Sequence, residues 1–296
     1  MNPLRARLEY LAVGALAFKF RWLPYRLACW LAAGVGWLAG DVLRLRRRVA
    51  LDNLLAAFPE LAPRELDKVY RRCWRHFSRV GAELARLPRL NNRFLKRWTE
   101  MSQQAVIAGA LKRGRGVILV AGHFGNWELT GGTLAKLGYP VTYVVAAQAN
   151  PLVDRWLDGV RRSTGVEIIR RRDAARGVLE ALKRNRVVAM LSDQDAGPAG
   201  VFVPFFGRPA STPRGPALFH LKTGAPVVYG AAVRDGDGRY CVTLEELSFG
   251  NLSGDRLRDS GRIMAQVTAR LESDVRLNPE QWFWLHRRWK TRPAPD

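Results

Sequence analysis

The stretch GVILVAGHFGNWELTGG, residues 116–132, decides the fold. Its first seven residues form a short apolar run bounded by glycines, which is typical of a buried strand in a parallel sheet. A helix is expected to begin near Trp127, so His123 lies in the turn between the strand and the helix. Open α/β sheets bind their ligands at this carboxyl edge of their strands. The stretch therefore predicts an α/β fold with a site where this strand ends.

The rest of the chain repeats the same alternation. Five more apolar runs are expected as strands, at 141–146, 166–169, 187–192, 226–233 and 240–247, with helical stretches at 129–137, 150–163, 173–184, 213–224 and 256–276. Strands that alternate with helices of this length predict a mostly parallel central sheet flanked by helices.

A chain of 296 residues is long enough for one large domain with a buried core. No Pro/Gly/Ser-rich linker and no internal repeat divides it. We therefore expect a single α/β domain over 49–296, helical over 49–115 and with its α/β core over 116–296, preceded by a distinct segment at 1–48.

The segment 1–48 carries nine Lys/Arg and two acids around two apolar runs, 10–18 and 27–43. The second run has about the shortest length that spans a bilayer, which is roughly 17–25 residues. Glycines and Asp41 weaken a full span, whereas basic residues beside Trp favour a helix lying in the cytoplasmic leaflet. A membrane-associated helical segment is the preferred interpretation, and a packed amphipathic helix of a soluble protein is the alternative.

The formal net charge is +22, with 48 Lys+Arg against 26 Asp+Glu, and there are ten Trp. Such a charge indicates acidic partners, such as nucleic acid, anionic lipid or an acidic protein. Part of the excess fits a coding bias towards Arg. The three cysteines lie far apart without a C-x-x-C pair, so neither a disulfide framework nor a cysteine zinc site is expected.

His123 and Glu128 are the strongest candidates for chemistry. Five positions would place them about 140° apart on one regular helix, so a turn at Gly125 and Asn126 is needed to fold them towards each other. A carboxylate beside an imidazole fixes its tautomer and stabilises the imidazolium, which makes a better general base. A structural histidine at a strand end is the alternative. No third ligand for a metal and no G-x-S-x-G nucleophile motif is evident.

A second group of residues follows the strand at 187–192. Asp193 and Gln194 stand at its carboxyl end, and the apolar segment VFVPFFG precedes Thr212 and a helix expected to begin at Pro213. The segment is either an apolar wall of an acyl channel or a loop packed over the core.

Together these segments resemble the late lipid A acyltransferases, the lauroyl and myristoyl transferases of the lysophospholipid acyltransferase superfamily. The resemblance rests on HFGNWE (123–128), the DQD segment (193–195), PFFGRPASTPRG (204–215) and PEQWFWLHRRWK (279–290), and it covers nearly the whole chain.

The resemblance implies direct acyl transfer without a cofactor or a covalent enzyme intermediate. His123 would deprotonate the acceptor hydroxyl and Glu128 would orient it, while Arg161 would stabilise an oxyanion or phosphate. Asp193 and Gln194 match a family segment, and Phe205, Phe206 and Thr212 are expected to bind substrate. The implied donor is an acyl carrier protein thioester, the acceptor is a lipid A precursor, and the implied location is the cytoplasmic side of the bacterial inner membrane.

Basic clusters fit these partners. Residues 155–186 hold ten Lys/Arg against four acids, and Arg287, Arg288, Lys290 and Arg292 crowd the carboxyl end. Acidic carrier proteins and phosphorylated lipids complement such surfaces, although a solvated helix face is the alternative. Three other functions are compatible with parts of the sequence. One is the same chemistry on another glycolipid or lysophospholipid, such as a phosphatidylinositol mannoside. The others are nucleic-acid binding, for which no module is recognisable, and an inactive membrane scaffold.

Overall fold

The computed structural model describes residues 2–294, whose centre is a seven-stranded sheet. Its strand order is β1-β9-β8-β2-β5-β3-β4. The bounds are β1 Thr99–Glu100, β2 Val117–Ala121, β3 Val141–Val145, β4 Glu167–Arg170, β5 Val187–Leu191, β8 Val227–Arg234 and β9 Tyr240–Glu246. All six strands expected from the sequence are confirmed, and within this sheet, as described for residues 2–294, β8–β9 is the one antiparallel pair.

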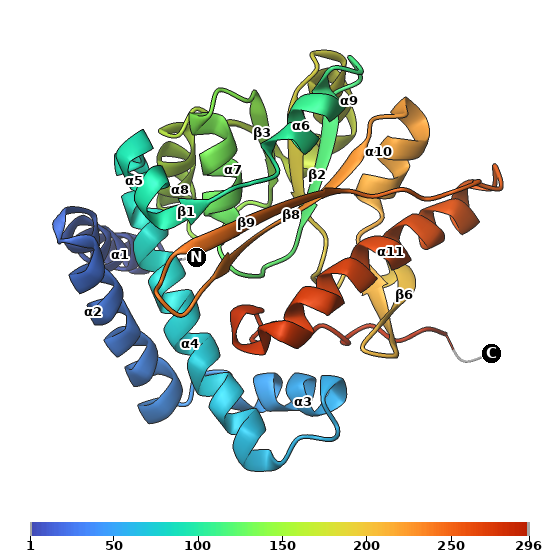
Figure 1. Cartoon of the computed structure of the whole chain (residues 1–296). Coiled ribbons are helices and arrows are strands. Elements are labelled where there is room, and N and C mark those ends of the chain that lie inside the picture. The colour runs from blue at the N-terminus through green and yellow to red at the C-terminus, as the bar shows by residue number, and fades with distance from the viewer. Residues whose placement is uncertain (1, 295–296) are drawn as a thin grey trace.

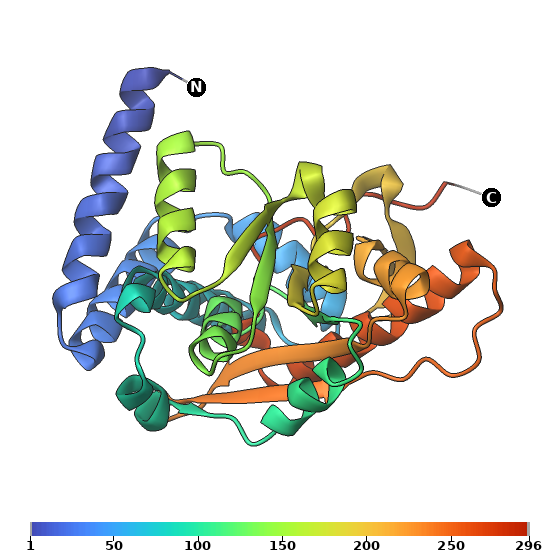
Figure 2. The same cartoon turned by 90° about the horizontal axis from the view of Figure 1, so that it is seen from above.

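Helices cover both faces of the sheet, as expected (Figures 1 and 2). One face packs against α6 (Gln104–Leu111) and α7 (Trp127–Lys136), with Ile107 and Leu134 fully buried. The other face packs against helices that include α9 (Ala174–Lys183), α10 (Gly215–Thr223) and α11 (Arg256–Leu277). The helix α10 begins at Gly215 rather than at Pro213, which is a small correction.

One hairpin is not expected from the sequence. The apolar segment VFVPFFG contributes β6 (Val201–Phe205), which pairs antiparallel with β7 (Arg208–Thr212). Phe206 and Gly207 form the turn, with φ of +52° and +69°. Positive φ at both turn residues matches the right-handed twist of paired strands, so this turn closes a tight hairpin. The sequence shows no strand alternation here because both faces of β6 carry apolar residues.

A helical arm precedes the sheet. It comprises α1 (Pro3–Trp22), α2 (Tyr25–Trp37), the π-helical turn η1 (Leu38–Val42), α3 (Arg47–Ala57), α4 (Pro63–Arg86), η2 (Leu87–Arg89) and α5 (Asn92–Trp98). Small residues hold α1 and α2 against α4: Ala28, Ala32 and Ala82 are almost completely buried together. A Cβ on Gly36 would lie 2.6 Å from the Arg75 Cα, so the crossing of α2 and α4 requires glycine there.

No single helix within residues 2–294 has both the length and the apolar character to cross a bilayer. One bent pair, Tyr25–Val42 with Arg47–Ala57, meets those criteria jointly, with 87° between its halves.

The carboxyl end returns to the core. Trp282 and Trp284 are buried among aromatic side chains, and Phe124 forms an isolated bridge with Trp282. The remaining helices, α8 (Pro151–Arg162), η3 (Arg171–Asp173), η4 (Gly197–Ala199) and η5 (Pro279–Gln281), complete the described chain. The tail thereby packs against the carboxyl ends of the central strands.

Candidate active site

Gly125 and Asn126 determine the geometry of the turn after β2. Gly125 has φ +57°, and a Cβ there would lie 2.0 Å from the Ala232 carbonyl oxygen, so a side chain is excluded. Asn126 then caps α7, because its side-chain oxygen accepts a hydrogen bond from the Leu129 backbone N–H. The turn is therefore rigid, and it presents His123 at the carboxyl end of β2.

The partner of His123 is Asp193, at the end of the neighbouring strand β5. Nδ1 of His123 lies 2.8 Å from one Asp193 carboxylate oxygen, and the His123 backbone N–H donates to the other at 2.7 Å. Since a carboxylate accepts, Nδ1 carries the hydrogen and Nε2 is left with its lone pair. The His123 side chain is 23% exposed, so Nε2 is within reach of a substrate.

Asp193 is buried and held by a third donor, the Trp282 indole N–H at 2.9 Å. Burial alone would raise its pKa, but the His123 imidazole and the hydrogen bonds from His123 and Trp282 hold the pKa of Asp193 below its ordinary value. The carboxylate therefore stays ionised beside the imidazole, which is the arrangement that stabilises an imidazolium.

Glu128 does not pair with His123, and this corrects the expectation from the sequence. Its carboxylate accepts from Nε of Arg161 at 3.0 and 3.2 Å and from Nη2 at 2.5 Å. Both side chains are buried, and the pair ties the first turn of α7 to α8. Glu128 points to α8 because it begins a regular helix, whereas His123 sits in the turn before it.

Gln194 and Asp195 extend the site from the same loop as Asp193. The Gln194 side-chain nitrogen lies 3.4 Å from Nε2 of His123, so its amide N–H donates a long hydrogen bond to the lone pair of that nitrogen. Asp195 instead binds the carboxyl tail, accepting from the Thr291 backbone N–H and hydroxyl at 3.1 and 2.9 Å. The loop after β5 thus joins the imidazole to the returning tail.

Phe205, Phe206 and Thr212, expected to bind substrate, are buried in the core. Phe205 borders a cavity of about 10 Å³ beside Asp193, which leaves no room for an acyl chain there. Thr212 accepts a hydrogen bond from Arg288 at 2.6 Å. In this structure all three pack the tail against the β6–β7 hairpin.

Arg288 does not belong to a basic surface. Its side chain is fully buried, its guanidinium donates to the Ser211 carbonyl, and burial lowers its pKa to about 10. The expectation of a basic cluster at the tail is therefore wrong for this residue.

A buried polar network that is not expected from the sequence lies behind the turn. Glu83 on α4 accepts from Tyr25, from Asn126 and from the buried Arg234. Tyr240 also donates to the carboxylate. These partners lie up to 157 positions from Glu83 in the sequence, so no local sequence pattern predicts the network. The network fixes the amide of Asn126 and hence the start of α7.

His76, on α4, is a buried histidine whose ring has a hydrogen-bond partner. Nε2 lies 3.0 Å from the Gly125 carbonyl oxygen, so this nitrogen carries a hydrogen and donates it. Burial, together with the positive charge of Arg234, lowers the pKa of His76 to about 4. The hydrogen bond from His76 to Gly125 stabilises the turn that carries His123, and the imidazole of His76 stays neutral at physiological pH.

A pH dependence of stability follows from His76. Its pKa is about 6.5 in the unfolded chain and about 4 in the folded one, so the unfolded state binds the extra proton between these values. The free energy of unfolding is therefore expected to fall by about 3 kcal/mol as the pH drops from about 6.5 to 4. His76→Gln keeps an amide donor near Gly125 and is expected to flatten this part of the curve.

Urea unfolding at a series of pH values measures this slope, with His220→Gln as the control that retains it. Equal slopes for wild type and His76→Gln would refute the assignment.

Among residues 2–294 no group of three or more His, Cys, Asp or Glu side chains is arranged to hold a metal ion. The three cysteines are free.

The chain matches a known family over almost all of its length. The family model described as bacterial lipid A biosynthesis acyltransferase matches residues 2–291. A lipid A biosynthesis lauroyltransferase of Escherichia coli K12 is 32% identical over 97% of this chain and 92% of its own. A palmitoleoyltransferase of the same organism is 28% identical over 93% and 88%. A phosphatidylinositol mannoside acyltransferase of Mycobacterium tuberculosis is 31% identical over 72% and 67%. The chain is therefore an acyltransferase that belongs to the bacterial lipid A biosynthesis acyltransferase family.

Proposed function

We propose that this enzyme moves a fatty acyl chain from an acyl carrier protein thioester to a hydroxyl of a lipid A precursor. The observation that carries the proposal is the His123–Asp193 pair, which leaves Nε2 of the partly exposed imidazole unprotonated at the carboxyl ends of β2 and β5. This arrangement suits a general base that acts on a hydroxyl.

The proposed reaction runs in one transfer. Nε2 of His123 takes the proton of the acceptor hydroxyl while the oxygen attacks the thioester carbonyl carbon, so that a C–O bond forms. The C–S bond then breaks, and the leaving sulfur takes the proton from the imidazolium to become a thiol. Asp193 stabilises the imidazolium between these steps, and Gln194 lies beside the reacting nitrogen.

Glu128 and Arg161 act in this proposal by holding α7 against α8. The oxyanion or phosphate contact expected of Arg161 would use Nη1, because Glu128 holds Nε and Nη2. Binding through Nη1 would cost little conformational entropy, because Glu128 already fixes the guanidinium of Arg161 in place.

Lipid A precursor is the first-choice acceptor because relatives named for lipid A synthesis align with more of the chain than those named for phosphatidylinositol mannoside. The test is a transfer reaction with purified enzyme, one acyl carrier protein thioester, and separate acceptors: lipid A precursor, phosphatidylinositol mannoside and lysophospholipid. Mass spectrometry of the products is expected to show acylated lipid A precursor. Turnover confined to another acceptor would reject this assignment.

The donor is expected to dock on part of the basic surface at 155–186. Not all of its arginines are available: Arg170 is ion-paired with Asp154 and Asp158, and Arg161 is buried. Arg171 and Arg172 are exposed on η3, where Arg172 makes only a solvent-exposed ion pair with Asp173. Such surface pairs contribute little, so these two arginines are the first candidates on this surface to meet an acidic carrier protein.

Arg171→Glu combined with Arg172→Glu is therefore expected to raise the KM for acyl carrier protein about tenfold and that for the lipid less. The effect should shrink as salt shortens the screening length to below about 10 Å. Arg256→Glu with Arg258→Glu, two exposed positions on α11, is the control. Equal KM values for variant and control would exclude docking at η3, and full activity with acyl-coenzyme A alone would exclude the carrier-protein donor.

We also propose that the amino-terminal helices bind an anionic membrane surface on the cytoplasmic side. The basis is the exposed apolar side chains of these helices. Trp30 is 68% exposed and Trp37 is 49% exposed, among exposed Leu, Val and Phe residues of α1, α2 and η1. Arginines lie close by on α1 and α2. Apolar side chains beside basic ones are typical of helices that lie in the membrane interface.

Trp30→Gln combined with Trp37→Gln is expected to weaken binding to vesicles that contain anionic lipid about tenfold or more. The reason is that burying a large apolar side chain contributes about 1.5–3 kcal/mol. Cosedimentation with vesicles measures the change. Leu257→Gln with Leu277→Gln, which removes exposed apolar residues on α11, is the control. Unchanged sedimentation of the Trp variant would place the membrane contact elsewhere.

A further inference from the structure

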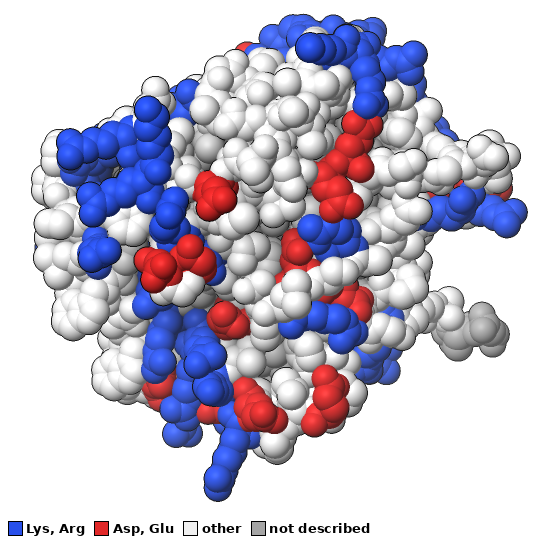
Figure 3. All heavy atoms as spheres, in the orientation of Figure 1, with Lys and Arg blue, Asp and Glu red and all other residues white. Residues whose placement is uncertain are grey.

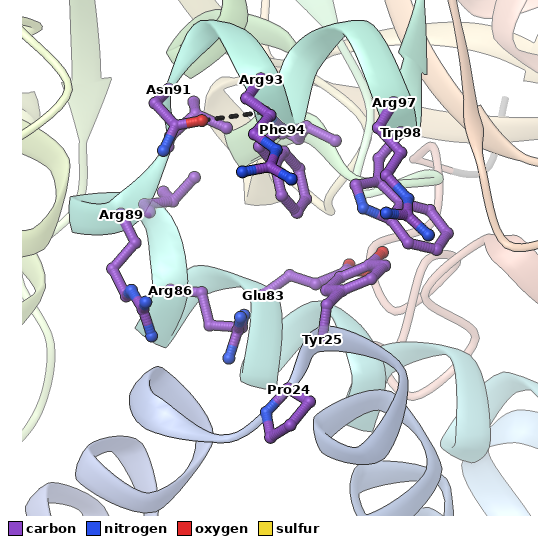
Figure 4. A pocket seen from close by; sticks show the side chains of 13 residues that line it. Pro24, Tyr25, Glu83, Arg86, Arg89, Asn91, Arg93, Phe94, Arg97 and Trp98 are labelled. Carbon is purple, nitrogen blue, oxygen red and sulfur yellow. Dashed lines mark hydrogen bonds between the residues drawn. The ribbon is translucent and has the colours of Figure 1, made fainter.

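A cavity of about 520 Å³ lies where α2, α4 and α5 meet, and His123 is not among the residues that line it. Figure 4 shows Arg86 and Arg89 on one side of it and Arg93 and Arg97, from α5, on the other. The remaining walls are Pro24, Tyr25, Glu83, Leu87, Leu90, Asn91, Phe94, Trp98 and Leu129. Four guanidinium groups thus line one cavity whose size suits a head group rather than a single small ion.

The four arginines lack acidic partners. Within residues 2–294, no carboxylate lies within ion-pair distance of any of them. Glu83, the acid in the lining, is already bound by Arg234 and by the hydroxyls of Tyr25 and Tyr240. The positive charge of the cavity is therefore not compensated by the described protein.

Hydrogen bonds to backbone carbonyls fix Arg86 and Arg89, whereas Arg97 lies over the ring of Trp98, 5.4 Å from its centre. Arg86 donates to the carbonyls of Phe20 and Leu23 at 2.5 and 2.6 Å, and Arg89 donates to that of Arg21 at 2.9 Å. Burial, and then the neighbouring charge of Arg89, lower the pKa of Arg86. An anion between them would relieve this repulsion.

Arg93 and Arg97 are exposed and stand one turn apart on α5, with no hydrogen bond drawn from their guanidinium groups. On the face shown in Figure 3, basic side chains gather over α5 and the start of α2. A planar guanidinium binds two oxygens of a phosphate at once, which a lysine ammonium does not. This pair therefore suits a phosphate that enters from the surface.

The cavity is joined to the active site through α4 and Glu83. Glu83 accepts from Asn126, the cap of α7, at 2.9 Å. Two turns earlier on α4, Phe77 packs against Trp127 and Phe283, which both contact the ring of His123. Six residues of helix cover about 9 Å, so Glu83 at the cavity and Phe77 beside the aromatic rings around His123 stand on one short stretch of α4.

We propose that the cavity lined by Arg86, Arg89, Arg93 and Arg97 binds the phosphate-bearing head group of a membrane lipid. The site lies beside α1 and α2, so its ligand is at head-group depth when these helices rest on a membrane. The identity of that lipid as the acyl acceptor rests on the proposed function, whereas phosphate binding by the cavity does not.

The test compares wild type with Arg93→Gln combined with Arg97→Gln, which leaves the structural Arg86 and Arg89 in place. Arg256→Gln with Arg258→Gln removes the same charge from exposed positions on α11 and is the control. Binding is measured by isothermal titration with inorganic pyrophosphate and by cosedimentation with phosphatidylcholine vesicles, with and without phosphatidic acid. The pocket variant is expected to bind pyrophosphate about tenfold more weakly or worse, and the control to match wild type.

Transfer kinetics distinguish the two sources of the head group. If the acceptor occupies the cavity, the pocket variant raises the KM for a phosphorylated acceptor at least about tenfold, and less for the same acceptor without its phosphates. If bulk phospholipid occupies it, the loss is in sedimentation with phosphatidic acid vesicles. Either result supports the proposal.

The proposal is overturned if wild type, pocket variant and control agree in pyrophosphate affinity, vesicle binding and KM. Absence of transfer by wild type to every acceptor would instead reject the proposed function, and the titration with pyrophosphate would still decide the cavity.

Discussion

Replacing His123 with alanine is expected to lower the rate of acyl transfer by ~10²–10⁴-fold or more, because a positioned general base contributes about that much. The Nε2 lone pair of His123 is the reacting group in the proposed mechanism, and Asp193 leaves it free by binding Nδ1. The fold should persist, since the turn is held by backbone hydrogen bonds of Gly125 and Asn126.

Rates are measured with saturating donor and acceptor, and thermal unfolding confirms that the variant is folded. His220→Ala, on α10, removes a histidine outside the site and should retain wild-type turnover. A folded His123→Ala enzyme with near wild-type turnover would end the general-base proposal.

Asp193→Asn is expected to reduce kcat by ~10²–10⁴-fold while the protein stays folded. An amide in place of the carboxylate no longer holds the hydrogen on Nδ1 and does not stabilise an imidazolium. The site geometry is kept, because the side-chain oxygen of asparagine still accepts a hydrogen bond from the His123 backbone or Trp282. The loss is therefore electronic rather than steric.

Glu128→Gln is the matched comparison, since it also turns a buried carboxylate into an amide. It leaves Arg161 buried without a counter-charge, which typically costs about 3–5 kcal/mol of stability. A large fall in unfolding temperature with a smaller fall in kcat is expected. If instead Glu128→Gln abolished turnover in folded protein and Asp193→Asn did not, Glu128 would be the partner of the imidazole after all.

The strands could be predicted because each is a short apolar run with glycine, proline or charged residues at its ends. The run 226–233 is an example, and it matches β8 to within one residue at each end. The hairpin β6–β7 escaped prediction since Pro204 and consecutive apolar residues hide the period of a strand. Its turn is recognisable only from the positive φ of Phe206, a property of the backbone.

His123 could be predicted, but its partner could not be obtained from local spacing. The pairing of His123 with Asp193 depends on β2 and β5 lying side by side in register, from Val117 with Val187 to Ala121 with Leu191. Both residues follow the ends of predicted strands, which is the one signal in the sequence that would have placed them together. Glu128, closer in sequence, is carried away by the helix.

Charge counts predicted basic surfaces, yet they do not tell which arginines are exposed. Arg161, Arg170 and Arg288 belong to clusters in the sequence, but the structure pairs or buries each of them. Arg93 and Arg97 belong to no cluster identified in the sequence, yet they line a cavity whose positive charge has no acidic partner among the described residues. The difference arises from tertiary packing of α5 against α2 and α4.

A single-turnover reaction with isotopically labelled acyl carrier protein thioester and lipid A precursor tests the proposed reaction most directly. Mass spectrometry should find the label on the lipid, one free carrier thiol for each acyl group moved, and no labelled enzyme at any time. Label on the enzyme, or its release as free fatty acid instead of acylated lipid, would contradict direct transfer by the His123–Asp193 pair.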